Sequence, residues 1–131
     1  MNKKRFFVIA LFLCAASFVN AQMVGNDEDK HGCKASAGYT YSAVLKECIQ
    51  IHTQSIKLEG VSADTKGFTG TIIFSKDKKQ AEVFVREASP SILLSRKGKE
   101  GSYVWKKGDY SLTESKGYIV KKGGVEIYKS K

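Results

Sequence analysis

Residues 68–128 read FTGTIIFSKDKKQAEVFVREASPSILLSRKGKEGSYVWKKGDYSLTESKGYIVKKGGVEIY. The stretch consists of short runs in which apolar and polar residues alternate, separated by glycine, aspartate, serine, lysine and one proline. Alternation with a period of two indicates strands with one buried face, and turn residues at roughly 8–12-residue spacing indicate an antiparallel meander. The sequence therefore predicts a mostly β domain that closes as a barrel or folds as a sandwich. The expected strands cover residues 69–75, 81–86, 91–96, 102–106, 109–113, 117–121 and 125–129.

The run over residues 81–86 shows how the two faces are assigned. Ala81 and Val83 lie on one face and supply an aliphatic core, while Glu82 and Phe84 lie on the other. Phe84, Leu93 and some of the tyrosines are thus left opposite the core. We expect a second layer to cover them, for which a short N-terminal helix is the candidate, and the alternative is an exposed aromatic patch that binds a partner.

The first 21 residues have the three parts of a secretory signal peptide. A head with three basic residues precedes an apolar run over residues 6–16, and small residues precede a cleavage site after Ala21. The alternative, a membrane anchor, is disfavoured because a spanning helix needs about 20 apolar residues. We expect residues 1–21 to be removed, Cys14 among them. The mature protein is then exported, either periplasmic or secreted, with no transmembrane segment.

Removal of this leader changes the charge. It holds three of the 22 basic residues and none of the 13 acidic ones, so the mature net charge is +6. A basic surface favours acidic envelope polymers, anionic lipid or acidic proteins as partners, and the alternative is that the lysines only keep the protein soluble. Nucleic acid is not expected, because no recognition motif is present. The remaining length fits a flexible polar tail over 22–32 and one domain over 33–131, expected to be a monomer.

Cys33 and Cys48 are the cysteines left after cleavage. An even pair in an oxidising compartment predicts a disulfide. Closing a loop of about 15 residues restricts the unfolded chain by roughly 3 kcal/mol in the loop-entropy model. The spacing is far from Cys-x-x-Cys, so we expect a structural bond.

Residues 33–49 read CKASAGYTYSAVLKECI. Thr40 or Ser42 could cap a short helix in which Val44 and Cys48 share one face. The segment resembles a Cys-x-x-Ser-Ala-Gly-Tyr-Thr-(aromatic)-Ser pattern, ending in Lys-x-Cys-Ile, of small exported bacterial proteins with no assigned activity. We expect one short N-terminal helix, clamped by the disulfide, that covers one end of the sheet.

No complete catalytic or metal-binding constellation is present in the sequence. His31 follows acidic residues that could ligate a cation, but no second ligand group stands at a fixed spacing. His52 has no acid or nucleophile that the sequence pairs with it, so a solvent-facing or core-edge position is expected. We therefore expect a protein that is not an enzyme and that binds no cofactor and no metal. A pocket that pairs His52 with an acid is the alternative.

Residues 103–112 read YVWKKGDYSL and resemble the Phe-Trp-x-Lys-Gly-Asp-x-Ala-x-Leu segment of the membrane-bound and periplasmic inhibitors of C-type lysozyme. The resemblance implies an eight-stranded antiparallel barrel. In that family a loop serine and the lysine of this segment, here Lys107, enter the lysozyme cleft. Charge-assisted hydrogen bonds would hold such a lysine between the two catalytic carboxylates. The implied partner-binding residues are Lys107, Trp105, Asp109 and Tyr103.

The chain departs from that family in three respects. The Ser-Gly-x-x-Tyr loop that supplies the serine has no counterpart between Ser95 and Trp105, both mature cysteines precede the expected barrel, and a net charge of +6 repels the basic lysozymes. The structural alternative is a core Trp105 followed by a hairpin turn at Lys107.

Taken together, these patterns predict a barrel of about seven or eight strands in an exported, non-enzymatic binding protein. It is expected to be lysozyme-inhibitor-like. The alternative is an envelope structural or adhesion module that binds anionic polymer or lipid through its lysine-tipped loops.

Overall fold

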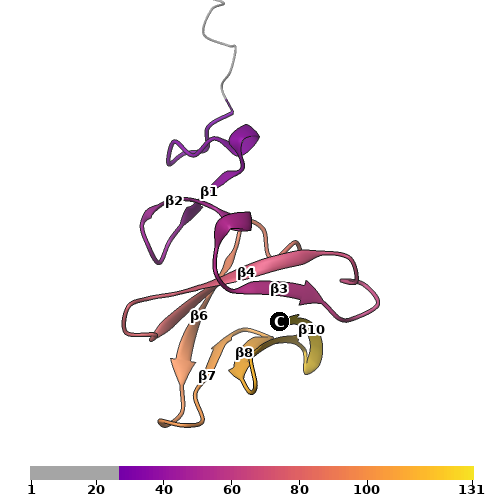
Figure 1. The fold of residues 1–131 in the computed structure, drawn as a ribbon. Coiled ribbons are helices and arrows are strands. Elements are labelled where there is room, and N and C mark those ends of the chain that lie inside the picture. Colours follow the sequence, from indigo (N-terminus) through magenta and orange to yellow (C-terminus); the bar gives the residue numbers. More distant parts are fainter. Residues whose placement is uncertain (1–26) are drawn as a thin grey trace, which may run out of the picture.

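The computed structural model describes residues 27–131 (Figure 1). The predicted signal peptide, 1–21, and the first part of the predicted tail lie outside these residues. Within 27–131 the helical elements are two 3-10 turns, η2 (Ala35–Ala37) and η3 (Ile51–Thr53). No helix in this part of the chain is long and apolar enough to cross a membrane.

Eight antiparallel strands form a closed barrel in the order β10-β3-β4-β5-β6-β7-β8-β9. Seven of them are the strands that the alternation predicts. The closed ladder shows that the domain is a barrel and not a sandwich, the two architectures that the sequence left open. The eighth, β3, pairs with β10 and closes the ladder. The bounds are β3 (Lys57–Gly60), β4 (Thr69–Phe74), β5 (Gln80–Phe84), β6 (Ile92–Lys97), β7 (Val104–Lys107), β8 (Tyr110–Glu114), β9 (Tyr118–Lys122) and β10 (Val125–Ser130).

Side chains fill the barrel interior. Most residues that alternation places on the inner face are buried, and Trp105 and Tyr128 are the largest of them. Eight strands enclose a space just wide enough for side chains to fill, so a packed core is the expected outcome. The aliphatic residues with no exposed surface are Leu58, Ala81, Val83, Leu94, Leu112 and Val120.

The N-terminal segment covers the outer face of β4 and β5. It forms a two-stranded hairpin, β1 (Tyr39–Ser42) and β2 (Glu47–Gln50), which lies beside the barrel above β4 in Figure 1. Phe84 and Ile73 point outward and are buried with Ile49 in a second apolar cluster. The predicted second layer over Phe84 is therefore confirmed.

The predicted N-terminal helix is wrong, because the chain makes a hairpin turn there. The N–H of Lys46 donates to the carbonyl of Ser42 at 2.7 Å, which closes a single turn, and Ser42 Oγ accepts the N–H of Leu45 at 3.1 Å as a cap would. Lys46 then adopts a left-handed φ of 59°, which ends the turn. Residues of β2 pair back on β1, Tyr41 opposite Cys48. One turn is too short to be stable as a helix, so strand pairing prevails.

The predicted disulfide is confirmed. Cys33 and Cys48 are bonded with their Cα atoms 5.6 Å apart. The residues before it fold back, since the carboxylate of Asp29 accepts the N–H groups of His31 and Cys33 at 2.8 and 3.0 Å. The bond from the N–H of Cys33, followed by the bond from the N–H of His31, holds the pKa of Asp29 below its usual value. The disulfide thus ties β2 to this folded-back segment.

Glu82 fastens the hairpin turn to the barrel. Its carboxylate, on the outer face of β5, is 1% exposed. Ser42 Oγ and the N–H of Val44 donate to Oε2 at 2.8 and 3.1 Å. The N–H of Ala43 and Ser91 Oγ donate to Oε1 at 3.1 and 2.7 Å. A buried charge with this many partners is satisfied, and it fixes the hairpin in one position.

Candidate functional site

The turns of the barrel alternate between its two ends. We call residues 75–79, 96–103 and 114–117 the lysine-rich end, and residues 61–68, 85–91, 107–110 and 122–125 the opposite end. The lysine-rich end carries seven basic side chains (Lys76, Lys78, Lys79, Arg96, Lys97, Lys99, Lys116) and three acidic ones (Asp77, Glu100, Glu114). The opposite end carries four basic side chains (Lys66, Arg86, Lys107, Lys122) and three acidic ones (Asp64, Glu87, Asp109). The excess of positive charge is therefore concentrated at one end.

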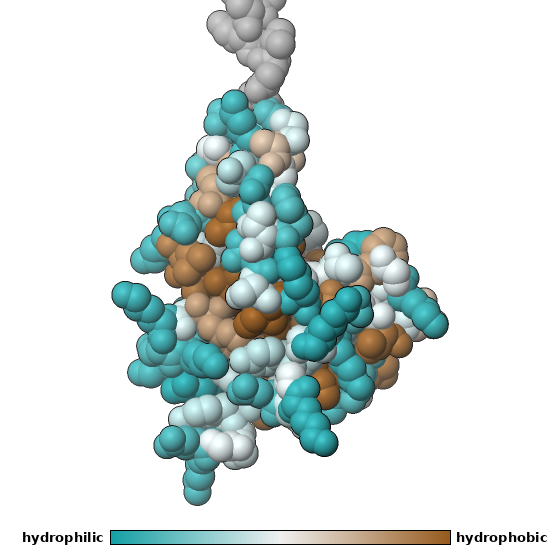
Figure 2. All heavy atoms as spheres, in the orientation of Figure 1, coloured by the Kyte–Doolittle hydropathy of each residue, from teal (hydrophilic) through white to brown (hydrophobic). Residues whose placement is uncertain are grey.

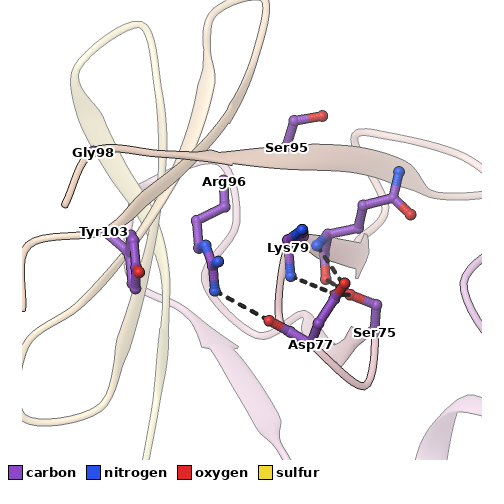
Figure 3. Close-up of a pocket in the computed structure, with 8 residues that line it drawn as sticks. Ser75, Asp77, Lys79, Ser95, Arg96, Gly98 and Tyr103 are labelled. Atoms are coloured by element: carbon purple, nitrogen blue, oxygen red, sulfur yellow. Dashed lines mark hydrogen bonds between the residues drawn. The ribbon is translucent and has the colours of Figure 1, made fainter. Parts of the chain in front are cut away.

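An open groove of about 680 Å³ lies at the lysine-rich end. The connection between β4 and β5 forms one wall, and the end of β6 with the β6–β7 turn forms the other (Figure 3). Its size falls within the roughly 300–1,000 Å³ typical of small-molecule sites. The lining residues are Ser75, Asp77, Lys79, Gln80, Ser95, Arg96, Gly98 and Tyr103.

Arg96 is the best-positioned cation of this groove. It follows the buried Leu94 by two residues on β6, so it faces inward, at the mouth of the barrel. Its guanidinium carbon lies 4.0 Å from the centroid of the Tyr103 ring, and Nη1 donates to the carbonyl of Asp77 at 3.1 Å. Stacking on an aromatic face and a backbone acceptor together hold the planar group in one orientation (Figure 3).

The β4–β5 turn is held by the carboxylate of Asp77. Its Oδ1 accepts the N–H of Lys79 at 2.9 Å and the hydroxyl of Ser75 at 2.8 Å. These two bonds lower the pKa of Asp77 below its usual value. Lys78 takes a left-handed φ of 57°, and its carbonyl accepts the indole N–H of Trp105 at 2.8 Å. The turn is thereby joined to the core beneath it.

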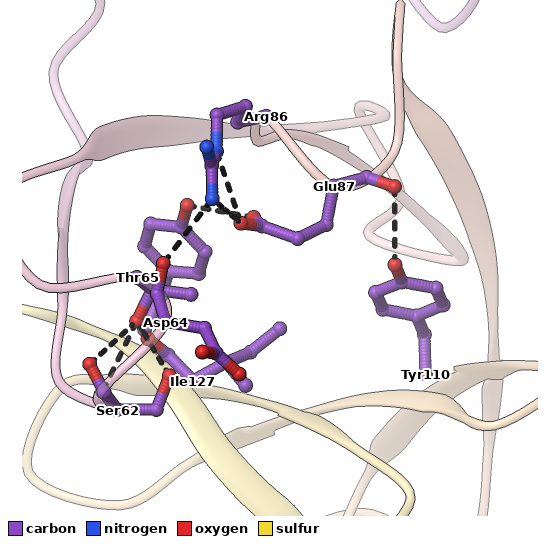
Figure 4. Close-up of polar contacts among 8 residues, drawn as sticks. Ser62, Asp64, Thr65, Arg86, Glu87, Tyr110 and Ile127 are labelled. Carbon is purple, nitrogen blue, oxygen red and sulfur yellow. Dashed lines mark hydrogen bonds and ion pairs between the residues drawn. The ribbon is translucent and has the colours of Figure 1, made fainter.

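The opposite end is closed by a polar network (Figure 4). The hydroxyl of Tyr128 donates to Glu87 Oε1 at 2.7 Å, and Arg86 contacts Glu87 Oε2 at 3.3 Å. Arg86 also donates to the carbonyl of Asp64 at 3.2 Å and lies 3.8 Å from the centroid of the Phe68 ring. These groups satisfy one another, so the network joins the two long connections of the barrel.

The network shifts two pKa values. Burial, followed by the hydrogen bond to Glu87, raises the pKa of Tyr128 well above its usual value of 10.0. Burial alone would raise the pKa of Glu87, but the hydrogen bonds from Tyr128 and Arg86 outweigh it and the pKa lies below its usual value. The neutral phenol and the ionised carboxylate are therefore the forms that the folded protein favours.

The four residues implied by the resemblance occupy three places. Lys107 and Asp109 are exposed and flank the β7–β8 turn at the opposite end. Trp105 is 2% exposed and lies in the core, the position given by the structural alternative, while Tyr103 lies beside Arg96 at the lysine-rich end. The structure thus brings Lys107 together with Asp109 and separates both from Tyr103.

Both histidines lie on the N-terminal unit. His31 stacks on Tyr41 with ring centroids 3.5 Å apart, beside a groove of about 570 Å³ between the hairpin and the β5–β6 connection. Glu82 reaches this groove, but its oxygens already accept the hydrogen bonds described above. His52 lies exposed in η3.

Arg96 and Glu82 are the residues that sequence reasoning missed. A signal existed for each, because Arg96 follows Leu94 in phase with the core and Glu82 interrupts an apolar run. Within residues 27–131 no group of three or more His, Cys, Asp or Glu side chains is placed to hold a metal ion. Comparisons of the chain with protein-family models, with curated proteins and with solved structures find no match.

Proposed function

We propose that the protein is an exported, non-enzymatic binding protein whose lysine-rich end holds an anionic polymer of the cell envelope. One observation carries the proposal: the uneven division of charge between the two ends of the barrel. Clustered cations raise the local concentration of a polyanion and release its counterions on contact. The disulfide supports export, because such bonds persist in oxidising compartments.

A polymer fits this end better than a lipid surface. Among residues 27–131 the large apolar side chains with the greatest exposure are Val61, Phe68 and Val125 at the opposite end and Tyr39 and Leu45 on the hairpin. Membrane-surface binding uses buried apolar groups as well as charge. On the face drawn in Figure 2, hydrophilic and neutral atoms cover the lower part, where Figure 1 places the β6–β7 turn. The charged end therefore lacks the apolar component that a membrane would require.

The test compares two variants that lose equal charge. The triple variant Lys76→Gln, Lys97→Gln, Lys99→Gln changes the lysine-rich end, and Lys66→Gln, Lys107→Gln, Lys122→Gln changes the opposite end. On immobilised polygalacturonate, we expect retention of the unmodified protein that falls with salt, because exposed charges are screened. The first variant should elute at clearly lower salt and the second close to the unmodified protein. Absent or salt-insensitive retention, or equal losses in both variants, would contradict the proposal.

Inhibition of a C-type lysozyme is the second candidate. It is favoured by the exposed Lys107 beside Asp109 on a turn of a closed eight-stranded barrel, which is the setting that the resemblance implies. Lys107→Ala should then weaken inhibition and leave the melting temperature unchanged. The unmodified protein failing to inhibit lysozyme would dispose of this candidate. Since the two candidates use opposite ends, the charge variants also separate them.

A further inference from the structure

We propose that the groove at the lysine-rich end is a subsite for one acidic sugar unit, a hydroxylated ring that carries a carboxylate or a phosphate, with Arg96 binding the anionic group. The inference rests on the proposed function and specifies which part of the polymer is recognised. The subsite would bind a single oxyanion at a defined position, in addition to the general attraction between the basic end and an anionic polymer.

Arg96 is prepared for this contact. Its stacking on Tyr103 uses one face of the guanidinium, and within residues 27–131 its hydrogen bond to the carbonyl of Asp77 uses one of five N–H donors. The remaining donors of the planar fork match two oxygens of a carboxylate or phosphate. Because the group is already oriented, little rotamer freedom is lost when a ligand binds.

An aromatic group lies next to the groove, on the inner side of the barrel. Phe74 packs on Trp105 and on Tyr118 with ring centroids 5.2 Å apart in both pairs, and this group closes the mouth of the barrel. Lys78 Nζ lies 5.0 Å from the centroid of the Phe74 ring. Apolar rings beside a cation lower the local dielectric constant and so strengthen its attraction for an anion.

The rest of the lining indicates hydroxyl groups on the ligand. The hydroxyl of Ser75 is used within the turn, because it donates to Asp77 and accepts the N–H of Gln80. Asp77 offers the groove a carboxylate that its bonds to the turn keep ionised, and such a group accepts hydrogen bonds from ligand hydroxyls. Asp77 would repel a bare anion but accepts hydrogen bonds from a sugar. A ring that carries both an oxyanion and several hydroxyls can satisfy Arg96 and Asp77 from separate groups. A neutral sugar lacks the oxyanion, and inorganic phosphate has only P–OH donors on the same small group.

Titrations followed by two-dimensional NMR of the intact mature protein test the ligand class. Glucuronate and glucose 1-phosphate show whether the anionic group is a carboxylate or a phosphate. Glucose supplies the hydroxylated ring without an anionic group, and inorganic phosphate supplies the anionic group without the ring. We expect saturable shifts of the amides of Arg96, Gly98 and Tyr103 with at least one sugar acid, at least tenfold tighter than with glucose or inorganic phosphate. Binding of inorganic phosphate as tight as that of both sugar acids, or no saturable shift with either sugar acid, would overturn the proposal.

Two adjacent variants test the residue. Arg96→Gln and Lys97→Gln each remove one positive charge from β6, but of the two residues only Arg96 lines the groove. We expect about a tenfold or greater loss of sugar-acid affinity for Arg96→Gln and less than about a twofold loss for Lys97→Gln. Equal losses of affinity in the two variants would show that only the overall positive charge of this end attracts the ligand, and would contradict a specific role for Arg96. Arg96→Lys, which keeps the charge without the fork, should also lose most of the affinity, and unchanged fluorescence of Trp105 checks that the fold is intact.

Failure of this inference and failure of the proposed function give different results. If the triple lysine variant loses retention on polygalacturonate while Arg96→Gln keeps both retention and sugar-acid affinity, the end binds polymer without this subsite. If the unmodified protein is not retained at all, the proposed function itself is wrong.

Discussion

Replacing Glu82 by glutamine tests how the hairpin is held on the barrel. The carboxylate accepts bonds from two hydroxyls and two backbone N–H groups. Glutamine has nearly the same shape but keeps one acceptor oxygen and places an NH₂ group where the other stood. One orientation of the amide turns the NH₂ toward Ser42 Oγ and the N–H of Val44, and the other turns it toward Ser91 Oγ and the N–H of Ala43. In either case the hydroxyl can rotate and accept, whereas the backbone N–H is left facing another donor.

The magnitude follows from these contacts. A hydrogen bond to a charged group contributes about 1.5–3 kcal/mol, and a buried donor without a partner costs about 1–3 kcal/mol. Glu82→Gln orphans one N–H and removes charge assistance from the remaining bonds, so we expect the free energy of unfolding to fall by about 2–4 kcal/mol. That is a large share of the roughly 5–15 kcal/mol that stabilises a typical domain.

Two measurements check this result. Urea unfolding followed by Trp105, the single tryptophan, reports the barrel, and hydrogen exchange at the amides of Ala43 and Val44 reports the hairpin turn. Exchange at both amides should be faster in Glu82→Gln. Glu114→Gln, at the exposed end of β8, is the matched control and should change stability by less than about 0.5 kcal/mol. An equally small effect of Glu82→Gln, with unchanged exchange, would refute the reasoning.

The remaining predictions concern three other contacts. Tyr128→Phe should lower stability at pH 7 by about 1.5–3 kcal/mol, because it removes a buried hydrogen bond to a carboxylate. The pKa of Tyr128 is raised in the folded state, so its contribution to the free energy of unfolding is complete below pH 10.0 and is lost as pH rises above that value. Urea unfolding at a series of alkaline pH values should therefore show a shallower decline of stability for Tyr128→Phe than for the unmodified protein. Parallel declines would argue against the pairing of Tyr128 with Glu87. Replacing Cys33 and Cys48 together by alanine should cost roughly 3 kcal/mol in urea unfolding if the hairpin and barrel unfold together; a loss confined to hydrogen exchange in β1 and β2 would instead show that the hairpin opens alone. Gly70→Ala should destabilise the barrel by about 1–3 kcal/mol, because the added Cβ would overlap the carbonyl oxygen of Phe84 on the paired strand; a thermal midpoint equal to that of the unmodified protein would contradict the packing described.

The barrel could be predicted because its signals are local. Each expected strand in the meander lies within two residues of an observed one, since alternation and turn residues both act over short distances. The division of charge between the two ends also follows from the sequence, once successive turns of a meander are assigned to alternate ends.

The hairpin and the groove could not be predicted, because they depend on contacts between distant residues. Residues 43–49 carry an apolar spacing that suits a helix, but Glu82, far along the chain, takes the N–H groups of the turn and β1 offers a partner strand. Arg96 could be placed near the end of a strand, whereas its support by Tyr103 and Asp77 requires the three-dimensional arrangement. Tertiary context overrides local propensity at such positions.

The pairing of β3 with β10 has a consequence for biogenesis. A ribosome delivers β3 early and β10 last, so during synthesis the row of backbone donors and acceptors along β3 has no neighbour. Until Val125–Ser130 arrive, the nascent sheet is an open template for other extended chains, and such intermediates are prone to aggregate. Premature termination before this segment would leave one open edge on β3 and one on β9, so addition of the last strand is the step that removes both exposed edges of the sheet.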